Sequence, residues 1–279
     1  MQTQPAPIQV QHLFEPLDDS LMELLYALTP ADWEKSTVAR LWKVKDVAAH
    51  LLDGNIRTLS LQKDRYFGET PPAINTYNEL VDWLNKLNAD WVAAAKRMSP
   101  AVLILLHEAT RKETSAYYKS LNLYDKAVFA VSWAGEEESL NWLHIAREYT
   151  EKWLHQQQIR DAVHKPGIMT STFFYPFMDT CMYALPYTYK NIDAATGTTI
   201  ELHIEGDGGG SWLLTKTGSG WLLSKEYERN VTARISLPAA IAWKLFSKSM
   251  RPADITNSIH VTGDETLALH ALNMISVMA

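Results

Sequence analysis

Cysteine is almost absent from this sequence: its 279 residues include one, Cys181. A single cysteine excludes an internal disulfide and every zinc module that is built from cysteine ligands. Met178 and Met182 lie beside Cys181 in an apolar segment. Because a free cysteine in such surroundings behaves as a small hydrophobic side chain, we expect Cys181 to be buried.

Basic blocks, long apolar runs and a leader segment are also missing. The net charge of −6 is spread along the chain, which leaves no electrostatic footprint for nucleic acid and no polybasic membrane patch. The least charged stretch, residues 166–189, is too interrupted by prolines to span a bilayer. The first residues lack the basic and apolar regions of a signal peptide. We therefore predict a cytoplasmic protein that binds neither nucleic acid nor membranes.

Apolar residues, in contrast, are abundant. They make up 47% of the chain and charged residues 21%, as is typical of a globular protein with a sizeable core. The first half follows the apolar spacing of helices, whereas alternating runs after residue 190, separated by glycine-rich turns, predict antiparallel strands. We therefore predict an α+β protein with two domains. A helical domain spans 1–165, a proline-punctuated connector spans 166–190, and a small α+β domain with an antiparallel sheet spans 191–279.

A predicted helix at residues 141–163 carries the densest group of metal-competent side chains. The segment lacks Gly and Pro and is rich in helix-forming residues. At about 100° per residue, a narrow stripe of one helix face contains His144, Glu148, Glu151 and His155. Aromatic residues lie on the opposite side. Such a stripe either faces water or lines a site inside a bundle.

Glu151 and His155 form the sharpest part of this stripe. Residues four apart on a helix are neighbours, so a carboxylate oxygen and an imidazole nitrogen can converge on one ion. Zinc accepts both ligands at about 2.0–2.2 Å, but it needs at least one more from another segment. A pair of this kind taken alone is more often ordinary solvated helix surface.

His50 is the candidate for the missing ligand because it lies on another predicted helix. It shares a polar stripe there with Asp46, Asp53 and Arg57. One interpretation is a polar helix edge with stabilising pairs four residues apart. The other is that His50 meets Glu151 and His155 across a bundle, since metal sites in bundles are built from side chains on facing helices.

Two motifs connect these residues to a known family. The first follows the pattern L-T-x-x-[DE]-W, then a Trp two residues before a Val, then D-[VL]-x-x-H-L; it is matched by Leu28, Thr29, Asp32, Trp33, Trp42, Val44, Asp46, Val47, His50 and Leu51. The second, E-x-W-x-H, is matched by Glu151, Trp153 and His155. In both motifs the chain resembles the mycothiol-dependent maleylpyruvate isomerase family, part of the DinB-like superfamily. The resemblance implies a DinB-like four-helix bundle in which His50, Glu151 and His155 are the metal ligands.

The C-terminal part is similar to the sterol-carrier-like domain that follows the bundle in many relatives. A late G-D-x-x-L-A signature is matched by Gly263, Asp264, Leu267 and Ala268. Relatives often carry a Gly-Arg pair at the end of the first helix of this domain, where this sequence reads Ser249-Met250-Arg251. In the isomerase, an arginine of this domain is implicated in catalysis, so the resemblance makes Arg251 a catalytic candidate.

Two histidines and one glutamate leave a coordination position open, as in catalytic zinc sites. Imidazole and carboxylate discriminate poorly among divalent metals, so nickel, iron and manganese suit the set as well as zinc. A bound ion lowers the pKa of a water toward ~7 or binds a thiol as its thiolate. The resemblance implies the second use, with a low-molecular-weight thiol as cosubstrate.

Three further residues are candidates for roles beside the ligands. His144 and Glu148 either orient a ligand, act as general acid or base, or belong to a solvated face. Arg57 either binds a carboxylate of the substrate or cofactor, or is an ordinary exposed arginine. Asp46 either accepts the ring N–H of His50 or places a favourable charge at the start of its helix.

The leading hypothesis is therefore a metal-dependent, thiol-using isomerase or S-transferase acting on a small electrophile. The thiol and the electrophile would be its partners, and a homodimer is one oligomeric state that we consider. The alternatives are a non-catalytic DinB-like stress protein that binds metal, and a carrier of an apolar ligand through the C-terminal domain. Within the enzyme hypothesis, hydrolysis by a metal-bound water would need no thiol.

Overall fold

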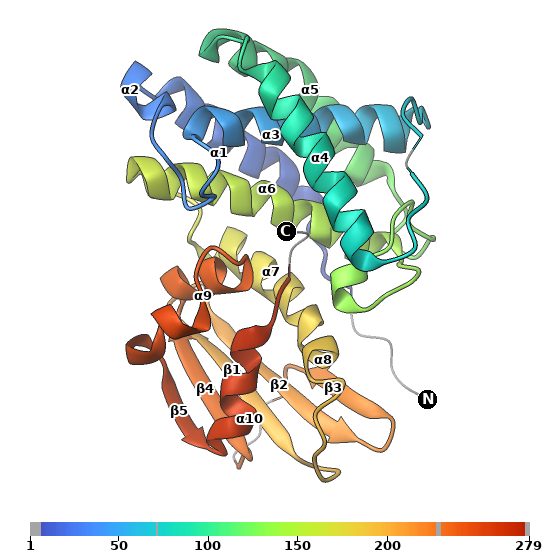
Figure 1. Cartoon of the computed structure of the whole chain (residues 1–279), viewed down its shortest axis with the longest axis vertical. Helices are drawn as coiled ribbons and strands as arrows, with labels where there is room; N and C mark the ends of the chain where they lie inside the picture. The colour runs from blue at the N-terminus through green and yellow to red at the C-terminus, as the bar shows by residue number, and fades with distance from the viewer. Residues whose placement is uncertain (1–6, 71, 227–229, 277–279) are drawn as a thin grey trace. The chain divides into compact units, whose positions relative to one another are not determined.

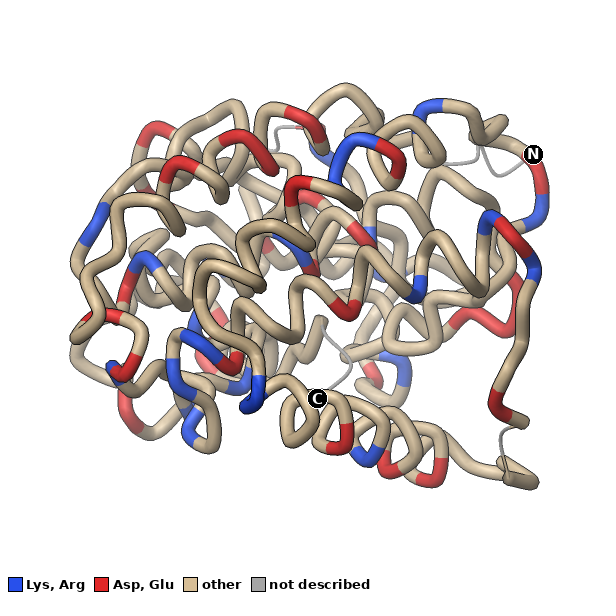
Figure 2. The backbone as a smooth tube through the Cα atoms, turned by 90° about the horizontal axis from the view of Figure 1, so that it is seen from above, with Lys and Arg blue, Asp and Glu red and all other residues tan. Residues whose placement is uncertain are grey.

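The computed structural model describes residues 7–70, 72–226 and 230–276, and the chain divides into two units (Figure 1). The first unit comprises residues 1–129 and 139–168, and the second comprises 130–138 and 169–278. None of the helices in the described ranges combines the length and the apolar composition needed to cross a membrane. Along the same ranges, Figure 2 shows basic and acidic residues interspersed on the backbone trace.

The first unit is helical. Its helices are α1 (Phe14–Tyr26), α2 (Pro30–Trp33), α3 (Val44–Arg57), α4 (Tyr77–Ala95), α5 (Pro100–Ser120) and α6 (Asn141–Val163), with a 3-10 turn η1 (Gln11–Leu13). Helix α3 continues into a π-helical turn, η2 (Thr58–Lys63). Helices α1, α5, α3 and α6 contact one another in a ring, and α4 packs against α3. This confirms the predicted four-helix bundle.

Local signals in the sequence explain where these helices begin. Thr29 forms a capping box with Asp32, and Pro30 occupies the first turn of α2. The Ser99 side chain accepts a hydrogen bond from the backbone N–H of Val102 at the start of α5. Between these helices, apolar side chains form one core; its fully buried members include Val44, Val47, Ala48, Leu52, Leu103 and Ile159.

A buried ion pair crosses the bundle core. The Lys152 ammonium on α6 donates to both carboxylate oxygens of Asp18 on α1, at 2.6 and 2.9 Å. It also donates to Asn55 Oδ1 on α3 at 2.9 Å. The side chain of Lys152 is 13% exposed and that of Asp18 is 4% exposed. Because the ammonium has three acceptors from two neighbouring helices, this pair joins α1, α3 and α6 at one point.

The second unit contains a five-stranded sheet in the order β3-β2-β1-β4-β5. The strands are β1 (Thr199–Glu205), β2 (Gly210–Thr217), β3 (Gly220–Ser224), β4 (Ala233–Pro238) and β5 (His260–Gly263). The pairs β1–β2, β2–β3 and β4–β5 are antiparallel, as predicted, whereas β1 and β4 are parallel. The register places Leu202 opposite both Trp212 and Ile235, and all three side chains are fully buried.

Helices cover this sheet, and two of them lie in the segment predicted as a connector. The helices are α7 (Ser171–Cys181), α8 (Leu185–Thr188), α9 (Ala239–Phe246) and α10 (Glu265–His270), with 3-10 turns η3 (Ser132–Ala134), η4 (Met182–Ala184), η5 (Pro252–Asp254), η6 (Thr256–Ser258) and η7 (Ala271–Asn273). Residues 166–190, predicted from the sequence as a proline-punctuated connector with no helices assigned to it, contain α7 and α8. Pro176 lies inside α7, and Pro186 occupies the first turn of α8, where no N–H is needed.

Candidate metal centre

Helix α6 is a central element of the bundle, and its polar stripe faces other helices. It packs against both α1 and α3, so neither of its long faces is fully open to water. His144 is fully buried, and Glu148, Glu151 and His155 are partly buried. The stripe that the sequence left open between water and a bundle interior therefore lines the interior.

The packing of α3 against α6 brings the three predicted ligands together. His50, Glu151 and His155 each offer one ligand atom, and these atoms lie within 4.8 Å of one another. His155 Nε2 lies 3.4 Å from Glu151 Oε2. Two ligands about 2.1 Å from a tetrahedral zinc ion are themselves about 3.4 Å apart, so this pair already has the required spacing. The His50 and His155 rings meet edge to face, with centroids 4.5 Å apart.

The surroundings of His50 favour the neutral imidazole, which can bind a metal ion, over the protonated imidazolium. The residue is 8% exposed, and its Nδ1 atom is buried without a hydrogen-bond partner. An unsatisfied buried polar group costs about 1–3 kcal/mol, so such groups need an explanation. Burial, His155 and the charge of Arg57 hold the pKa of His50 well below its ordinary value. The imidazole is therefore neutral at physiological pH, which is the form that binds metals.

His155 is oriented by a residue that the sequence analysis missed. Its Nδ1 atom lies 2.9 Å from Gln158 Oε1 on the next turn of α6. In the tautomer in which Nδ1 donates to this oxygen, the lone pair of Nε2 is directed toward Glu151. Metal-ligating histidines commonly have such a partner on the other ring nitrogen. The spacing of three residues from His155 was the available signal for Gln158. Together, these residues fit a divalent cation.

Asp46 does not serve as the corresponding partner of His50. Its Oδ2 atom accepts a hydrogen bond from the backbone N–H of Lys43 at 3.0 Å, which caps the start of α3. Of the two roles considered for Asp46, the structure shows the capping role.

His144 and Glu148 belong to a second polar cluster on α6. His144 Nε2 lies 2.8 Å from Gln62 Oε1, and Arg147 Nη2 lies 3.0 Å from His144 Nδ1. Glu148 Oε1 accepts hydrogen bonds from Arg147 at 2.6 Å and from Gln62 at 3.3 Å. Among the described residues, no hydrogen bond or ion pair of His144 or Glu148 reaches the three ligands. Their predicted roles beside the ligands remain predictions.

Gln62 was missed because its position depends on the π-helical turn. A π-helix widens the spacing of side chains, and such turns are frequent at functional sites. No role was predicted for Gln62 from the sequence, because helical periodicity does not show where such a turn occurs. Here it contacts both His144 and Glu148, so the change of helix type completes the polar cluster.

Burial and nearby charges give His144 and Glu148 different charge states at neutral pH. Burial and the nearby Arg147 lower the pKa of His144 to about 4. Burial opposes ionisation of Glu148, but the charge of Arg147, together with the charge of Arg57 and the hydrogen bond from Gln62, outweighs it and lowers its pKa. At neutral pH, His144 is therefore uncharged and Glu148 is a carboxylate.

The lowered pKa of His144 predicts a loss of stability in acid. The unfolded state binds this proton near pH 6.5 and the folded state only near pH 4, so the contribution is present above pH 6.5 and is lost as the pH falls toward 4. At about 1.4 kcal/mol per pH unit, His144 should account for roughly 3 kcal/mol of destabilisation. Urea unfolding from pH 7 to pH 4 should show a shallower pH dependence for His144→Gln than for wild type.

The exposed His12 provides a matched control, because His12→Gln should leave the pH dependence unchanged. Buried His107, whose pKa is also lowered to about 4, should keep a residual acid sensitivity in the His144→Gln variant. Equal slopes for wild type and His144→Gln would contradict the assignment of His144 as a buried neutral residue.

Arg57 lies within electrostatic reach of both clusters. Its charge lowers the pKa of His50 and that of Glu148. Its Nε atom pairs with Asp53 Oδ2 at 3.0 Å, and Nη2 donates to Asn88 at 3.2 Å. The side chain is 31% exposed, so part of the guanidinium can receive a ligand. Binding of a carboxylate by Arg57 remains a prediction.

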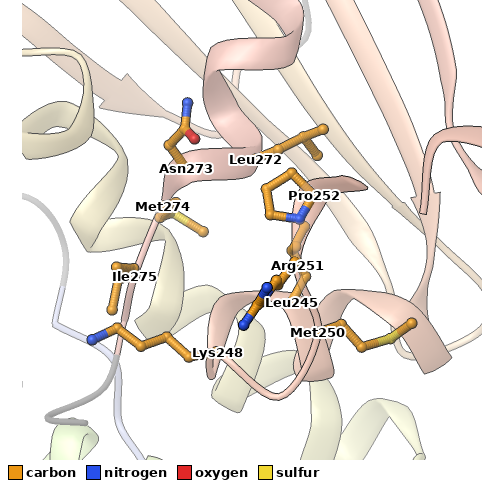
Figure 3. A pocket seen from close by; sticks show the side chains of 9 residues that line it. All are labelled: Leu245, Lys248, Met250, Arg251, Pro252, Leu272, Asn273, Met274 and Ile275. Atoms are coloured by element: carbon orange, nitrogen blue, oxygen red, sulfur yellow. The ribbon is translucent and has the colours of Figure 1, made fainter. Parts of the chain in front are cut away.

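Arg251 lies in the second unit and lines a pocket there. The pocket has a volume of about 320 Å³ and is bordered by Leu245, Lys248, Met250, Arg251, Pro252, Leu272, Asn273, Met274 and Ile275. Figure 3 shows the side chains of Arg251 and Lys248 extending toward the same side of this pocket. The Arg251 backbone N–H donates to Asp254 Oδ2 at 3.0 Å, and the Arg251 side chain is exposed. Its catalytic role also remains a prediction.

Comparisons with known proteins agree with the fold of this chain. A family model, the mycothiol maleylpyruvate isomerase N-terminal domain, matches residues 14–160. Two crystal structures of mycothiol-dependent maleylpyruvate isomerase, one of a point mutant, each cover 92% of this chain and 93% of their own, with a TM-score of 0.54 and 11% identity. At this identity they show a shared fold alone.

A structure described as UbiJ-SCP2 ubiquinone synthesis protein covers 36% of this chain and 88% of its own, at 16% identity. Its TM-score of 0.26 is too low to support any conclusion. No curated protein sequence matches the chain.

Proposed function

The chain belongs to the family of the mycothiol maleylpyruvate isomerase N-terminal domain, and we propose that it is a metal-dependent enzyme with a low-molecular-weight thiol as cosubstrate. The proposed reaction is the isomerisation of a small electrophile of the maleylpyruvate type, or transfer of the thiol to it. The observation that carries this proposal is the convergence of ligand atoms from His50, Glu151 and His155 within 4.8 Å. All three residues lie inside the matched range 14–160.

The donor set determines what a bound ion would supply. A divalent cation held by two imidazoles and one carboxylate keeps a position open and lowers the pKa of a thiol there, which provides a thiolate near neutral pH. The single cysteine of the chain is buried in α7, so the proposed sulfur nucleophile comes from the cosubstrate.

In the proposed isomerisation, the thiolate sulfur forms a bond to one carbon of the substrate's double bond, and the π electrons move to the adjacent carbonyl. Rotation about the resulting single bond follows. Return of the electrons then re-forms the double bond in the trans geometry and expels the thiolate. The reaction needs no net oxidant or proton.

The chain's own residues would bind and orient the reactants. We assign His155 and Glu151 to the ligand pair, with Gln158 fixing the His155 ring through the 2.9 Å contact. Arg57 is the proposed binding group for a substrate carboxylate in the first unit, because it carries a charge on a partly exposed side chain. Of the two candidates for proton transfer, Glu148 is ionised and suits an acceptor, whereas neutral His144 would position it.

This proposal predicts turnover that depends on both metal and thiol. Protein loaded with zinc should isomerise maleylpyruvate in the presence of mycothiol. Omission of the thiol should abolish turnover, and chelation of the metal should lower the rate about thirtyfold. The absorbance of substrate and product in stopped assays would measure the rate of isomerisation. The physical reason is that a free thiol, with a pKa of about 8.5, is mostly protonated at pH 7.

The alternatives predict different outcomes of the same assay. Full activity without thiol would favour hydrolysis by a metal-bound water. Stoichiometric metal with no turnover of any thiol and electrophile would favour the non-catalytic metal-binding protein. An apolar carrier would be supported by ligand retained in the second unit's pocket together with unchanged retention in a His155→Ala variant.

A further inference from the structure

We propose that Trp42 is the positioning residue of the candidate metal centre. Its indole packs against the His50 ring and holds it in its ligand orientation, because no hydrogen bond to His50 among the described residues could do so. This inference rests on the metal site of the proposed function. It assigns a role to a side chain that none of the ligand motifs requires for coordination.

The first step is the unequal support of the two histidine ligands. His155 has Gln158 at 2.9 Å from Nδ1. His50 has no hydrogen bond among the described residues, and its Nδ1 atom is buried without a partner. The torsion that turns an imidazole ring is broad, so an unsupported ring samples several orientations. Something else must fix His50 if it is to meet the other two ligands.

The second step is the contact that replaces the hydrogen bond. The indole of Trp42 lies against the His50 ring, with centroids 4.8 Å apart and planes inclined by 44°. The same indole lies 6.1 Å from the His155 ring. The His155 ring centroid lies 4.5 Å from that of His50, so the three rings form a triangle in which Trp42 and His155 contact His50 from adjacent sides. Rotation of the imidazole toward the indole would require Trp42 to move.

The third step is that Trp42 is itself held in place. Its backbone N–H donates to Ala39 O at 2.7 Å, and its carbonyl accepts from the Thr37 hydroxyl at 2.9 Å and the Thr37 N–H at 3.2 Å. The ends of this loop are joined by the Lys43–Glu34 ion pair at 2.8 Å. Because the loop is closed on both sides of Trp42, the backbone of Trp42 is anchored at the start of α3, and its side chain packs against the bundle core.

The fourth step is electrostatic. When an imidazole binds a divalent ion, part of the positive charge is shared by the ring, and the face of an indole attracts positive charge within about 6 Å. Trp42 lies within about this distance of both histidine ligands. It should therefore favour the metal-bound state beyond its steric effect.

The test compares Trp42→Leu with Trp42→Phe, and Trp83→Leu on α4 is the matched control, since Trp83 is partly exposed and contacts Lys86 instead of the ligands. Cobalt(II) affinity and the visible absorption spectrum of the cobalt protein are measured for each full-length variant. Loss of a group that orients a metal ligand typically weakens binding 10- to 100-fold. We expect at least a tenfold loss and an altered cobalt spectrum for Trp42→Leu, recovery of most of the affinity in Trp42→Phe, and wild-type behaviour for Trp83→Leu.

A metal-free measurement separates positioning from folding. The ring protons of His50 should show a ring-current shift in NMR spectra of the metal-free protein that disappears in Trp42→Leu and persists in Trp83→Leu. Wild-type cobalt affinity and spectrum in Trp42→Leu, or an unchanged His50 shift, would overturn the role of Trp42. If the wild-type protein binds no cobalt, the proposed function fails, and this inference fails with it. If wild type and Trp42→Leu bind cobalt with equal affinity, the inference alone fails.

Discussion

His155→Ala is expected to abolish stoichiometric metal binding. Wild-type protein purified with added zinc should contain about one equivalent by elemental analysis, because three ligands hold the ion. The variant keeps two ligands and also loses the contact with Gln158 that orients the site. We expect its affinity to fall at least a hundredfold, since removal even of groups behind the ligands costs 10- to 100-fold.

Metal binding should also stabilise the wild type and not the variant. At a metal concentration of about 100 times the Kd, binding to the folded state contributes about 2.7 kcal/mol. For a unit of this size the melting temperature should rise by roughly 5–10 °C on addition of zinc. The exposed His12 provides the control, and His12→Ala should behave as wild type in both measurements. Equal metal content in wild type and His155→Ala would show that the triad is not the binding site.

Lys152→Met is expected to produce the largest loss of folding stability. The Lys152 ammonium donates to both oxygens of Asp18, whose side chain is 4% exposed. Removal of the ammonium leaves a buried carboxylate whose described hydrogen-bond partner is Ser115 at 3.4 Å. Breaking a buried ion pair in this way costs about 3–5 kcal/mol. Urea unfolding followed by circular dichroism at pH 7 would measure the change.

Two further variants show whether the loss comes from the unpaired charge. In Asp18→Leu/Lys152→Met, both partners become apolar, and we expect the free energy of unfolding to return to within about 1 kcal/mol of wild type. Lys86→Met removes an exposed ion pair with Asp90, in which both side chains are at least 60% exposed, and should cost less than about 1 kcal/mol. Equal losses for Lys152→Met and Lys86→Met would mean that the buried pair contributes no more than a surface pair.

The bundle and the ligand positions were predictable because both depend on local periodicity. The apolar spacing predicted the helices, and the ring of contacts among α1, α5, α3 and α6 confirmed the bundle. Glu151 and His155 lie four residues apart, so any helix places them side by side. The motif resemblance then connected His50 to them, and the family match covers all three.

Other features could not be read from periodicity. The π-helical turn at η2 changes the spacing after Arg57 and brings Gln62 to His144 and Glu148, and periodicity did not predict this turn. No helix was predicted around Pro176, yet α7 accommodates it, and the Thr180 hydroxyl donates to the Pro176 carbonyl at 2.8 Å. The parallel pairing of β1 and β4 joins strands separated by a hairpin, which no local signal specifies.

The sequence by itself determined the helical first half, the strand-rich second half and the identity of the candidate ligands. The helices, the strands and the Glu151–His155 pair follow from side-chain spacing along one element, where geometry is fixed by the backbone period, whereas His50 was added to that pair by the family resemblance. The tertiary structure alone decided that the stripe of α6 is interior, that Asp46 caps α3, that His50 has no hydrogen bond among the described residues, and that Trp42 packs against the His50 ring. Each of these depends on contacts between elements, and such contacts are set by how the helices pack against one another and not by the period of any one of them.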